Sequence, residues 1–278
     1  MNQVVFESVR KVFRHRPALF NWIGRERTGE TLALNGVSFC AANREVVALL
    51  GPNGSGKTTA LKLVSTMLIP DGGSVRVSGF DAQHDSANVR RRVGIAVATE
   101  RSFFPRLSAR ENLEFFSALD EIPRRERTRR IEEVLRDTGL EEQADTLVTK
   151  FSSGMFQRLG LARALVKQPR VLLLDEPTRS LDAGATASLW ATIRALARQS
   201  TTVLLATHNF AEAAAVADRI LVLSGGRLLE NRALSGQESA DDLRALYFQQ
   251  TGDRGIAMDP SSPCNEPVAA RHRMESVP

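Results

Sequence analysis

The sequence has little cysteine, little lysine and no long apolar run. Its two cysteines, Cys40 and Cys264, lie far apart, which excludes a disulfide framework and favours a reducing compartment. The four histidines are scattered, without the spacing of metal ligands. No stretch approaches about 18 uninterrupted apolar residues, so we expect no segment to span a membrane. The composition, 42% hydrophobic and 25% charged over 278 residues, is ordinary for a globular protein with a substantial core.

A glycine-rich segment carries one of the five lysines. Residues 51–58 read Gly-Pro-Asn-Gly-Ser-Gly-Lys-Thr, which is the pattern G-x-x-x-x-G-K-S/T, and they follow the apolar run 46–50. The helix-patterned stretch 57–68 comes next. A strand that delivers such a loop to a helix start presents backbone N–H groups to phosphate oxygens. The sequence therefore predicts a nucleoside triphosphate site, formed by Gly51, Pro52, Asn53, Gly54, Ser55, Gly56, Lys57, Thr58 and Thr59.

The pattern of apolar residues divides the chain into three parts. The first part reads as strands, the middle part as helices that open with the capping box of Ser108 and Glu111, and the last part alternates both. We therefore predict an α/β P-loop core with a helical insertion between its first and later strands. The expected strands are 4–6, 37–40, 45–50, 74–77, 171–174, 201–206, 220–223 and 227–229, and the expected helices are 57–68, 155–167 and 183–198, with two more around Leu113 and Ile131.

Three of the expected apolar strands end in a chemically reactive group. These endings are the glycine-rich loop after Leu50, Asp175 and Glu176 after Leu174, and His208 after Thr207. Each group alone is equally well explained as a helix cap or a surface residue. Because ligands of parallel α/β sheets sit outside the carboxyl ends of the strands, we expect all three endings to meet around the triphosphate.

On these residues the chain resembles the ATP-binding subunits of ABC transporters. Residues 171–178 match the Walker B strand with its following glutamate, 180–182 match the D-loop, and His208 matches the switch histidine. Residues 151–158, Phe-Ser-Ser-Gly-Met-Phe-Gln-Arg, are similar to the signature LSGGQ-x-Q-R. A signature and a P-loop in one chain distinguish this family from other P-loop NTPases.

The resemblance implies an α/β fold with a RecA-like P-loop NTPase core, an N-terminal antiparallel β subdomain and an inserted α-helical subdomain. We expect an ABC ATP-binding domain over 1–252, with the helical subdomain at about 99–165. Residues 253–278 are rich in Asp, Pro and Ser and are expected to form a disordered tail. The loop 14–31 resembles insertions of exporter-type members and is expected to pack against the body through its apolar residues.

The resemblance also implies roles for the site residues. Asp175 and Thr58 would hold Mg²⁺, Glu176 would orient or deprotonate the attacking water, and His208 would hydrogen-bond the γ-phosphate of ATP. Lys57 would reach the β- and γ-phosphates. Since phosphoryl transfer depends mainly on positioning and charge stabilisation, loss of one group is expected to slow hydrolysis and to spare binding.

The signature implies a dimer. Ser152 and Gly154 precede the expected helix 155–167 and offer a second anion-binding helix start. In the family this second site closes on the ATP of a partner subunit, head to tail. The resemblance therefore implies a homodimer, or a heterodimer with a related ATPase subunit.

The chain departs from the family pattern at several positions. Ser153 and Met155 replace a glycine and the glutamine of the signature. The Q-loop glutamine is missing; Thr99 stands in its place with Glu100 next, and either has an oxygen that could bind Mg²⁺. Phe13 is the best substitute for the tyrosine that stacks on adenine, or else a core residue at a strand end.

The function implied is that of an ATP-hydrolysing, energy-coupling subunit, peripheral on the cytoplasmic face of the cell membrane, that drives export through a separate integral membrane permease. In the family the coupling helix of the permease docks at the segment matching 101–116. One alternative is a non-transport ABC ATPase acting on nucleic acid or the ribosome, because eleven arginines stand against six acids over 90–130. Such charge is more often a solvated face, and no nucleic acid partner is expected. Another alternative, motivated by the altered Q-loop, is a nucleotide-binding regulatory subunit.

Overall fold

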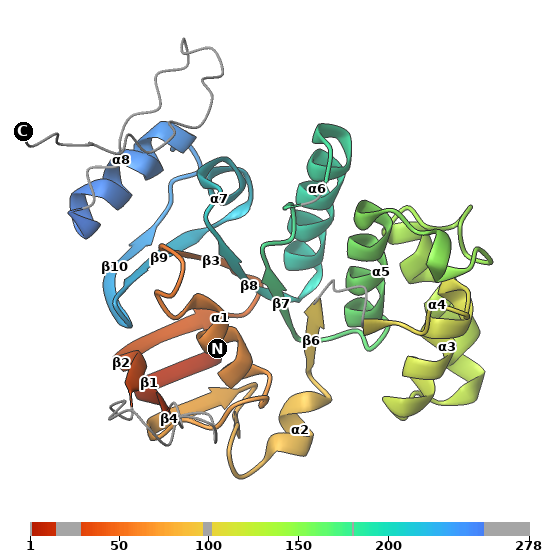
Figure 1. The fold of residues 1–278 in the computed structure, drawn as a ribbon, viewed down its shortest axis with the longest axis horizontal. Helices are drawn as coiled ribbons and strands as arrows, with labels where there is room; N and C mark the ends of the chain where they lie inside the picture. Colours follow the sequence, from red (N-terminus) through yellow and green to blue (C-terminus); the bar gives the residue numbers. More distant parts are fainter. Residues whose placement is uncertain (1, 15–28, 97–101, 180, 253–278) are drawn as a thin grey trace, which may run out of the picture.

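The computed structural model describes residues 2–14, 29–96, 102–179 and 181–252, which form two β-sheets and eight α-helices (Figure 1). The strands are β1 Asn2–Arg14, β2 Glu30–Ala42, β3 Val46–Leu50, β4 Gly72–Val77, β5 Phe80–Asp81, β6 Val93–Ala96, β7 Val171–Asp175, β8 Thr202–Thr207, β9 Arg219–Ser224 and β10 Arg227–Ala233. The helices are α1 Lys57–Val64, α2 Ser86–Arg90, α3 Ala109–Leu119, α4 Arg124–Asp137, α5 Ser153–Leu165, α6 Ala183–Gln199, α7 Phe210–Val216 and α8 Ala240–Thr251.

The larger sheet has six strands in the order β10-β9-β3-β8-β7-β6. All its pairs are parallel except the hairpin of β9 and β10. All five residues of β3 and all six of β8 are buried, which is why these strands read as continuous apolar runs. Since β3, β8 and β7 are parallel neighbours, their carboxyl ends lie at one edge of the sheet, as the sequence predicts.

This sheet separates two hydrophobic cores. Alternate residues of one strand enter different cores: Val47 and Leu49 pack with α1 and the smaller sheet, whereas Ala48 and Leu50 pack with the helices of the other face. The core on the face of Ala48 and Leu50 also contains residues of α6, α7 and α8. Both faces of the sheet are therefore covered, which fixes the loops at its edge.

The smaller sheet is antiparallel, in the order β2-β1-β4-β5, and confirms the predicted N-terminal β subdomain. Its inner face packs on the larger sheet through residues such as Phe6 and Phe39, whose rings stack with centroids 4.4 Å apart. Because β1 continues to Arg14, this sheet also carries Phe13 toward the P-loop.

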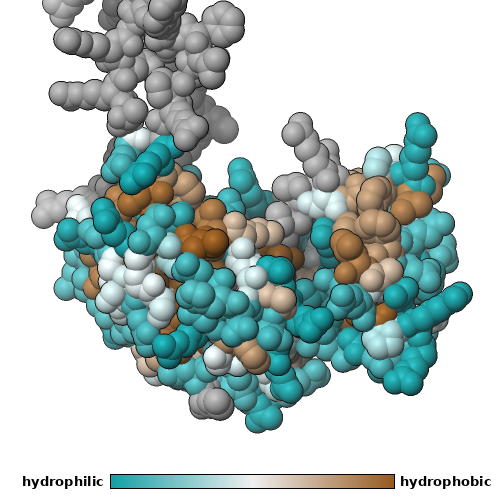
Figure 2. Space-filling view, turned by 90° about the horizontal axis from the view of Figure 1, so that it is seen from below, coloured by the Kyte–Doolittle hydropathy of each residue, from teal (hydrophilic) through white to brown (hydrophobic). Residues whose placement is uncertain are grey.

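The helices α3, α4 and α5 form the predicted subdomain on one side of the molecule (Figure 1). The capping box of Ser108 and Glu111 begins α3, as expected. Helix α5 lies so close to β6 that a Cβ on Gly94 would come within 2.4 Å of the Ala164 carbonyl oxygen. Figure 2 shows apolar surface over this subdomain, whose exposed large apolar side chains are Phe104, Phe115, Leu119 and Leu147.

Some helix boundaries differ from those predicted. Helix α1 ends at Val64 and not at residue 68, because Thr66 adopts a left-handed φ of 62° and turns the chain. Helix α5 begins two residues early, at Ser153, because Ser152 caps it. Helices α2, α7 and α8 and strands β5 and β6 were not predicted.

Several predictions lie outside the described residues. They are the loop 14–31 over its residues 15–28, Thr99 and Glu100, residue 180 of the D-loop, and the tail 253–278. Within the described ranges, none of the helices has the length and hydropathy needed to cross a bilayer.

Candidate functional site

A cleft of about 580 Å³ opens at the carboxyl edge of the larger sheet. It brings together the P-loop, the end of β1 and the end of β7, although more than a hundred residues separate β7 from the other two in the sequence. The predicted residues that line it are Phe13, Asn53, Gly54, Ser55, Gly56, Lys57, Thr58, Thr59, Asp175 and Glu176.

Two P-loop glycines are required by their surroundings. A Cβ on Gly51 would lie 2.3 Å from the Leu223 carbonyl oxygen and 2.4 Å from the Ser55 hydroxyl. Gly56 has a φ of +109°, and its Cβ would lie 2.5 Å from the Ala33 carbonyl oxygen. These close approaches leave room only for backbone, so the loop can wrap tightly and direct its N–H groups inward.

Lys57 is the first residue of α1 and is almost fully buried. Its ammonium donates hydrogen bonds to the carbonyl oxygens of Gly51, at 2.6 Å, and Pro52, at 3.2 Å. Burial lowers the pKa of this ammonium, against the opposing attraction of Glu176 and Asp175. The positive charge is thus placed inside the curve of the loop.

Thr58 and Asp175 meet across the cleft. The Thr58 hydroxyl donates a 2.8 Å hydrogen bond to Asp175 Oδ2, which joins the start of α1 to the end of β7. A hydroxyl and a carboxylate are hard oxygen donors, and Mg²⁺ in nucleotide sites is held by one or two such groups with phosphate and water completing its shell. The pair therefore fits Mg²⁺. The described ranges, this site included, contain no group of three His, Cys, Asp or Glu side chains that could hold a metal by itself.

Glu176 and His208 are also in contact. His208 Nδ1 lies 2.7 Å from Glu176 Oε2, within ion-pairing distance of the carboxylate. Glu176 has a left-handed φ of 49°, and its N–H donates to the Ala206 carbonyl oxygen at 2.9 Å. This uncommon backbone conformation turns the side chain after the strand ends.

Ser152 and Gly154 are placed apart from the P-loop of the same chain. Ser152 is the N-cap of α5, and its hydroxyl accepts a hydrogen bond from the Met155 N–H at 3.3 Å. Neither Ser152 nor Gly154 is among the described residues that line the cleft.

Gln157, Arg179, Thr31 and Ala33 also line the cleft and were not predicted. The Gln157 side chain donates to the carbonyl oxygens of Glu176, at 3.2 Å, and Pro177. Its place in the signature was a signal that could have identified it. Arg179 follows the Walker B segment without any recognisable motif.

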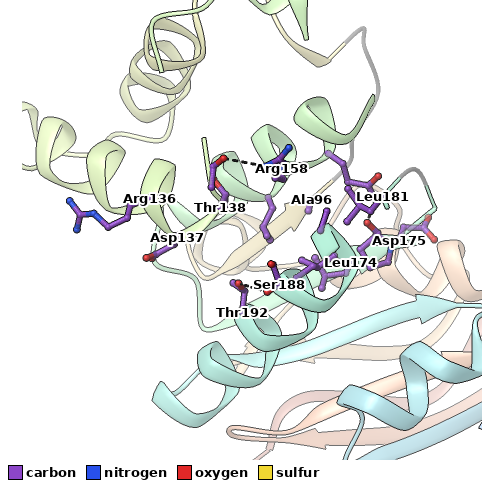
Figure 3. Close-up of a pocket in the computed structure, with 16 residues that line it drawn as sticks. Ala96, Arg136, Asp137, Thr138, Arg158, Leu174, Asp175, Leu181, Ser188 and Thr192 are labelled. Atoms are coloured by element: carbon purple, nitrogen blue, oxygen red, sulfur yellow. Dashed lines mark hydrogen bonds between the residues drawn. The ribbon is translucent and has the colours of Figure 1, made fainter. Parts of the chain in front are cut away.

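A second hollow of about 300 Å³ lies beside the cleft, between α5 and α6 (Figure 3). Arg158 from α5 and Ser188 and Thr192 from α6 point toward it, and Arg158 donates to the Gly139 carbonyl oxygen at 3.2 Å. Gln157 and Asp175 line both the hollow and the cleft. The signature helix is therefore linked to the site mainly through Gln157.

Comparisons with family models, known sequences and solved structures all point to the same protein family. The family described as ABC transporter matches residues 34–179. The chain is 38% identical to the daunorubicin resistance ATP-binding protein DrrA3 of Streptomyces coeruleorubidus, over 82% of this chain and 69% of that protein. It is 38% identical to the Nod factor export ATP-binding protein I of Burkholderia orbicola, over 80% of this chain and 74% of that protein.

Among solved structures, a post-hydrolysis dimer of an ATP-binding cassette bound to ADP and phosphate matches with a TM-score of 0.71 and 26% identity, over 83% of this chain and 98% of the other. These matches favour a transport ATPase over the nucleic acid and regulatory alternatives. The chain belongs to the ABC transporter family and is an ATP-binding, ATP-hydrolysing subunit that couples hydrolysis to transport.

Proposed function

We propose that this chain drives export through a separate integral membrane permease, from the cytoplasmic face of the membrane, by closing and opening as a dimer around two ATPs. The relatives named for Nod factor export and daunorubicin resistance support the direction of transport. The partner ATPase is a second copy or a related subunit. The transported molecule is recognised by the permease.

The observation that supports the proposed dimer is the placement of the two anion-binding helix starts. The start of α1 faces the cleft of its own chain, whereas Ser152 and Gly154 at the start of α5 do not line it. A second copy, placed head to tail, would present its own Ser152 and Gly154 to the phosphates in this cleft.

The geometry supports distinct roles around the triphosphate. Thr58 and Asp175 hold Mg²⁺, which supplies positive charge against the phosphates when bound. Lys57 neutralises phosphate oxygens from inside the loop. Glu176 orients the attacking water and takes its proton, while His208 holds the Glu176 carboxylate and reaches the γ-phosphate.

A groove between the core and the helical subdomain is suited to the permease. It encloses about 720 Å³ and combines apolar side chains, including the exposed Met67 and Leu119, with charged side chains of both signs, of which Arg91 pairs with Glu121 at 2.9 Å and Lys167 with Asp120 at 3.5 Å. None of its lining residues belongs to the described part of the segment 101–116, where the family resemblance predicts that the permease docks. A short helix of the permease with an apolar face would cover the exposed apolar side chains of the groove.

The dimer is tested with Glu176→Gln, which keeps the shape of the side chain and removes the base. We expect ATP hydrolysis to fall by about 10²-fold or more, with ATP affinity retained, and the protein to become a dimer in ATP by light scattering after gel filtration.

The matched controls are Ser152→Asp and Ser152→Asn, each combined with Glu176→Gln. Both residues cap helices as well as serine does, so the start of α5 is preserved. The aspartate would repel the phosphates of the partner's ATP, whereas the asparagine is neutral. We expect a dimer with Asn and a monomer with Asp, at equal ATP affinity per chain. Equal dimerisation of the two would overturn the head-to-tail arrangement.

A further inference from the structure

Helix α7 contains a fully buried acid that none of the roles above uses. Glu212 has no exposed surface, and neither of its carboxyl oxygens makes a hydrogen bond of normal geometry. It lies four residues after His208, and the Asn209 side chain accepts from its backbone N–H at the start of the helix. Burying a carboxyl in this way is costly, so its presence calls for a physical explanation.

Three segments of the chain surround the Glu212 carboxyl. Thr207 ends β8 directly before His208, Thr178 follows Glu176 and Pro177, and Trp190 belongs to α6. Burial raises the pKa of the carboxyl, and the hydroxyl and indole donors of these three residues oppose the rise. The Trp190 Nε1 group is itself buried without a partner of normal geometry. Donors and acceptor thus face one another inside the fold.

The neighbours of Glu212 connect directly to the catalytic groups. The Thr207 hydroxyl accepts a hydrogen bond from the Asn209 N–H at 3.0 Å, and so it orients the backbone on either side of His208. Thr178 lies two residues after Glu176. Helix α6, which carries Trp190, begins at the N-cap Asp182, the last residue of the D-loop motif.

We propose that Glu212 is a positioning residue: its carboxyl holds the strand end before His208, the segment after Glu176 and helix α6 in one arrangement. The inference rests on the proposed roles of Glu176 and His208 and adds the group that aligns them. A change at this junction would shift the two side chains relative to each other, and displacement of about 1 Å in a catalytic group can cost about 10²-fold in rate.

The test compares Glu212→Gln with Glu212→Ala. Glutamine keeps the size of the side chain and its capacity to accept from Thr207, Thr178 and Trp190, whereas alanine leaves those donors without an acceptor. We expect Glu212→Gln to keep kcat within about threefold, and Glu212→Ala to lower kcat by about tenfold or more while the affinity for ATP stays unchanged. Glu142→Ala, which removes an exposed acid from the helical subdomain, is the control for loss of a carboxylate.

The fluorescence of Trp190 reports whether nucleotide binding reaches the junction. A role of Glu212 in stability alone would not change this response. The chain has two tryptophans, Trp22 and Trp190, so the background Trp22→Phe leaves Trp190 as the single reporter. We expect Mg-ATP to change the emission of Trp190 in this background and in its Glu212→Gln variant. In the Glu212→Ala variant, Mg-ATP should no longer change the emission of Trp190.

If Glu212→Ala does not fold, Trp190→Phe replaces it, because it removes the indole N–H donor and keeps an aromatic ring at the junction. That variant should lower kcat while the affinity for ATP stays unchanged. Unchanged kcat in Glu212→Ala or Trp190→Phe, or a parallel loss of kcat, ATP affinity and melting temperature, would overturn the proposal. The proposed catalytic role would fail separately, through retained hydrolysis in Glu176→Gln.

Discussion

His208 Nδ1 lies 2.7 Å from Glu176 Oε2, and this contact joins the ends of two neighbouring parallel strands. Glu176 leaves β7 in a left-handed conformation, which turns its carboxylate toward the residue that follows β8. The two side chains are therefore in contact, with Glu176 lining the cleft and His208 largely exposed beside it.

Replacing His208 by alanine should remove that contact. We expect kcat for ATP hydrolysis to fall by about 10²-fold, with a change in ATP affinity of only a few fold, because the P-loop contacts remain. Steady-state hydrolysis and equilibrium nucleotide binding separate the two effects.

The control for His208→Ala is His84→Ala. His84 is an exposed histidine that makes the same kind of contact, 3.0 Å from Asp81 Oδ1, outside the cleft. Equal losses in the two variants would contradict a specific role for His208.

Thr58 can be tested by changing only its hydroxyl. Thr58→Val keeps the branched shape and removes both the 2.8 Å bond to Asp175 and an oxygen ligand, whereas Thr58→Ser keeps the oxygen. We expect Thr58→Val to raise the concentration of Mg²⁺ needed for half-maximal hydrolysis by about tenfold, and Thr58→Ser to change it little. A titration of free Mg²⁺ at saturating ATP gives the values, and EDTA should abolish hydrolysis in all three proteins.

Phe13 lines the cleft while half-buried, with the Lys11 ammonium 5.9 Å from its ring centroid. If the ring stacks on adenine, Phe13→Ala should weaken ATP binding by about 1–3 kcal/mol, roughly 5- to 150-fold, and Phe13→Tyr should restore it. Fluorescent nucleotide titration measures this change.

The melting temperature separates stacking from a core role for Phe13. If Phe13 is only a core residue, Phe13→Ala should lower the melting temperature markedly and leave the ATP affinity of the folded protein nearly unchanged. That result would refute adenine stacking.

The stability of the protein should depend on pH through Glu212. Burial raises the pKa of its carboxyl above the ordinary value of 4.5, and the charge of Glu176 adds to the rise against the donors of Thr207, Thr178 and Trp190. The folded chain therefore binds more protons than the unfolded chain above pH 4.5. Consequently this group's contribution to the unfolding free energy decreases as pH rises from 4.5 to the raised pKa.

Glu212→Gln has no titrating group at this position and should not show that decrease. The unfolding free energy of Glu212→Gln minus that of the unchanged protein should therefore increase as pH rises from 4.5 to the raised pKa. Above that pKa the difference should be constant. Urea unfolding of both proteins at a series of pH values measures the difference. Parallel curves would show that the pKa of Glu212 is the same in the folded and unfolded states.

The P-loop and the convergence of the strand ends on one site could be predicted from the sequence alone. The glycine pattern is local, and the buried parallel strands could be predicted from the uninterrupted apolar runs 46–50 and 171–174. The topology then places their carboxyl ends together without further information.

Features that depend on tertiary packing could not be read from the sequence. Glu212 stands among alanines and reads as a solvated helix face, yet α6 and the segment after β7 cover it completely. Helix α8 lacks a strong apolar stripe and buries only Leu243 and Tyr247. The end of α1 depends on the left-handed Thr66, a conformation without a sequence signal.

The close packing of α5 on β6 at Gly94 has a mechanical consequence. Near its C-terminal end, α5 carries Arg163, whose guanidinium lies 3.6 Å from the centroid of the Phe116 ring, and Ser152 caps its other end. The 13 residues of α5 span about 20 Å. Because the contact with Gly94 is made by Ala164, next to Arg163, the C-terminal end of α5 is held against β6. Any tilt of the helix about this fixed end would therefore move its Ser152 end the farthest.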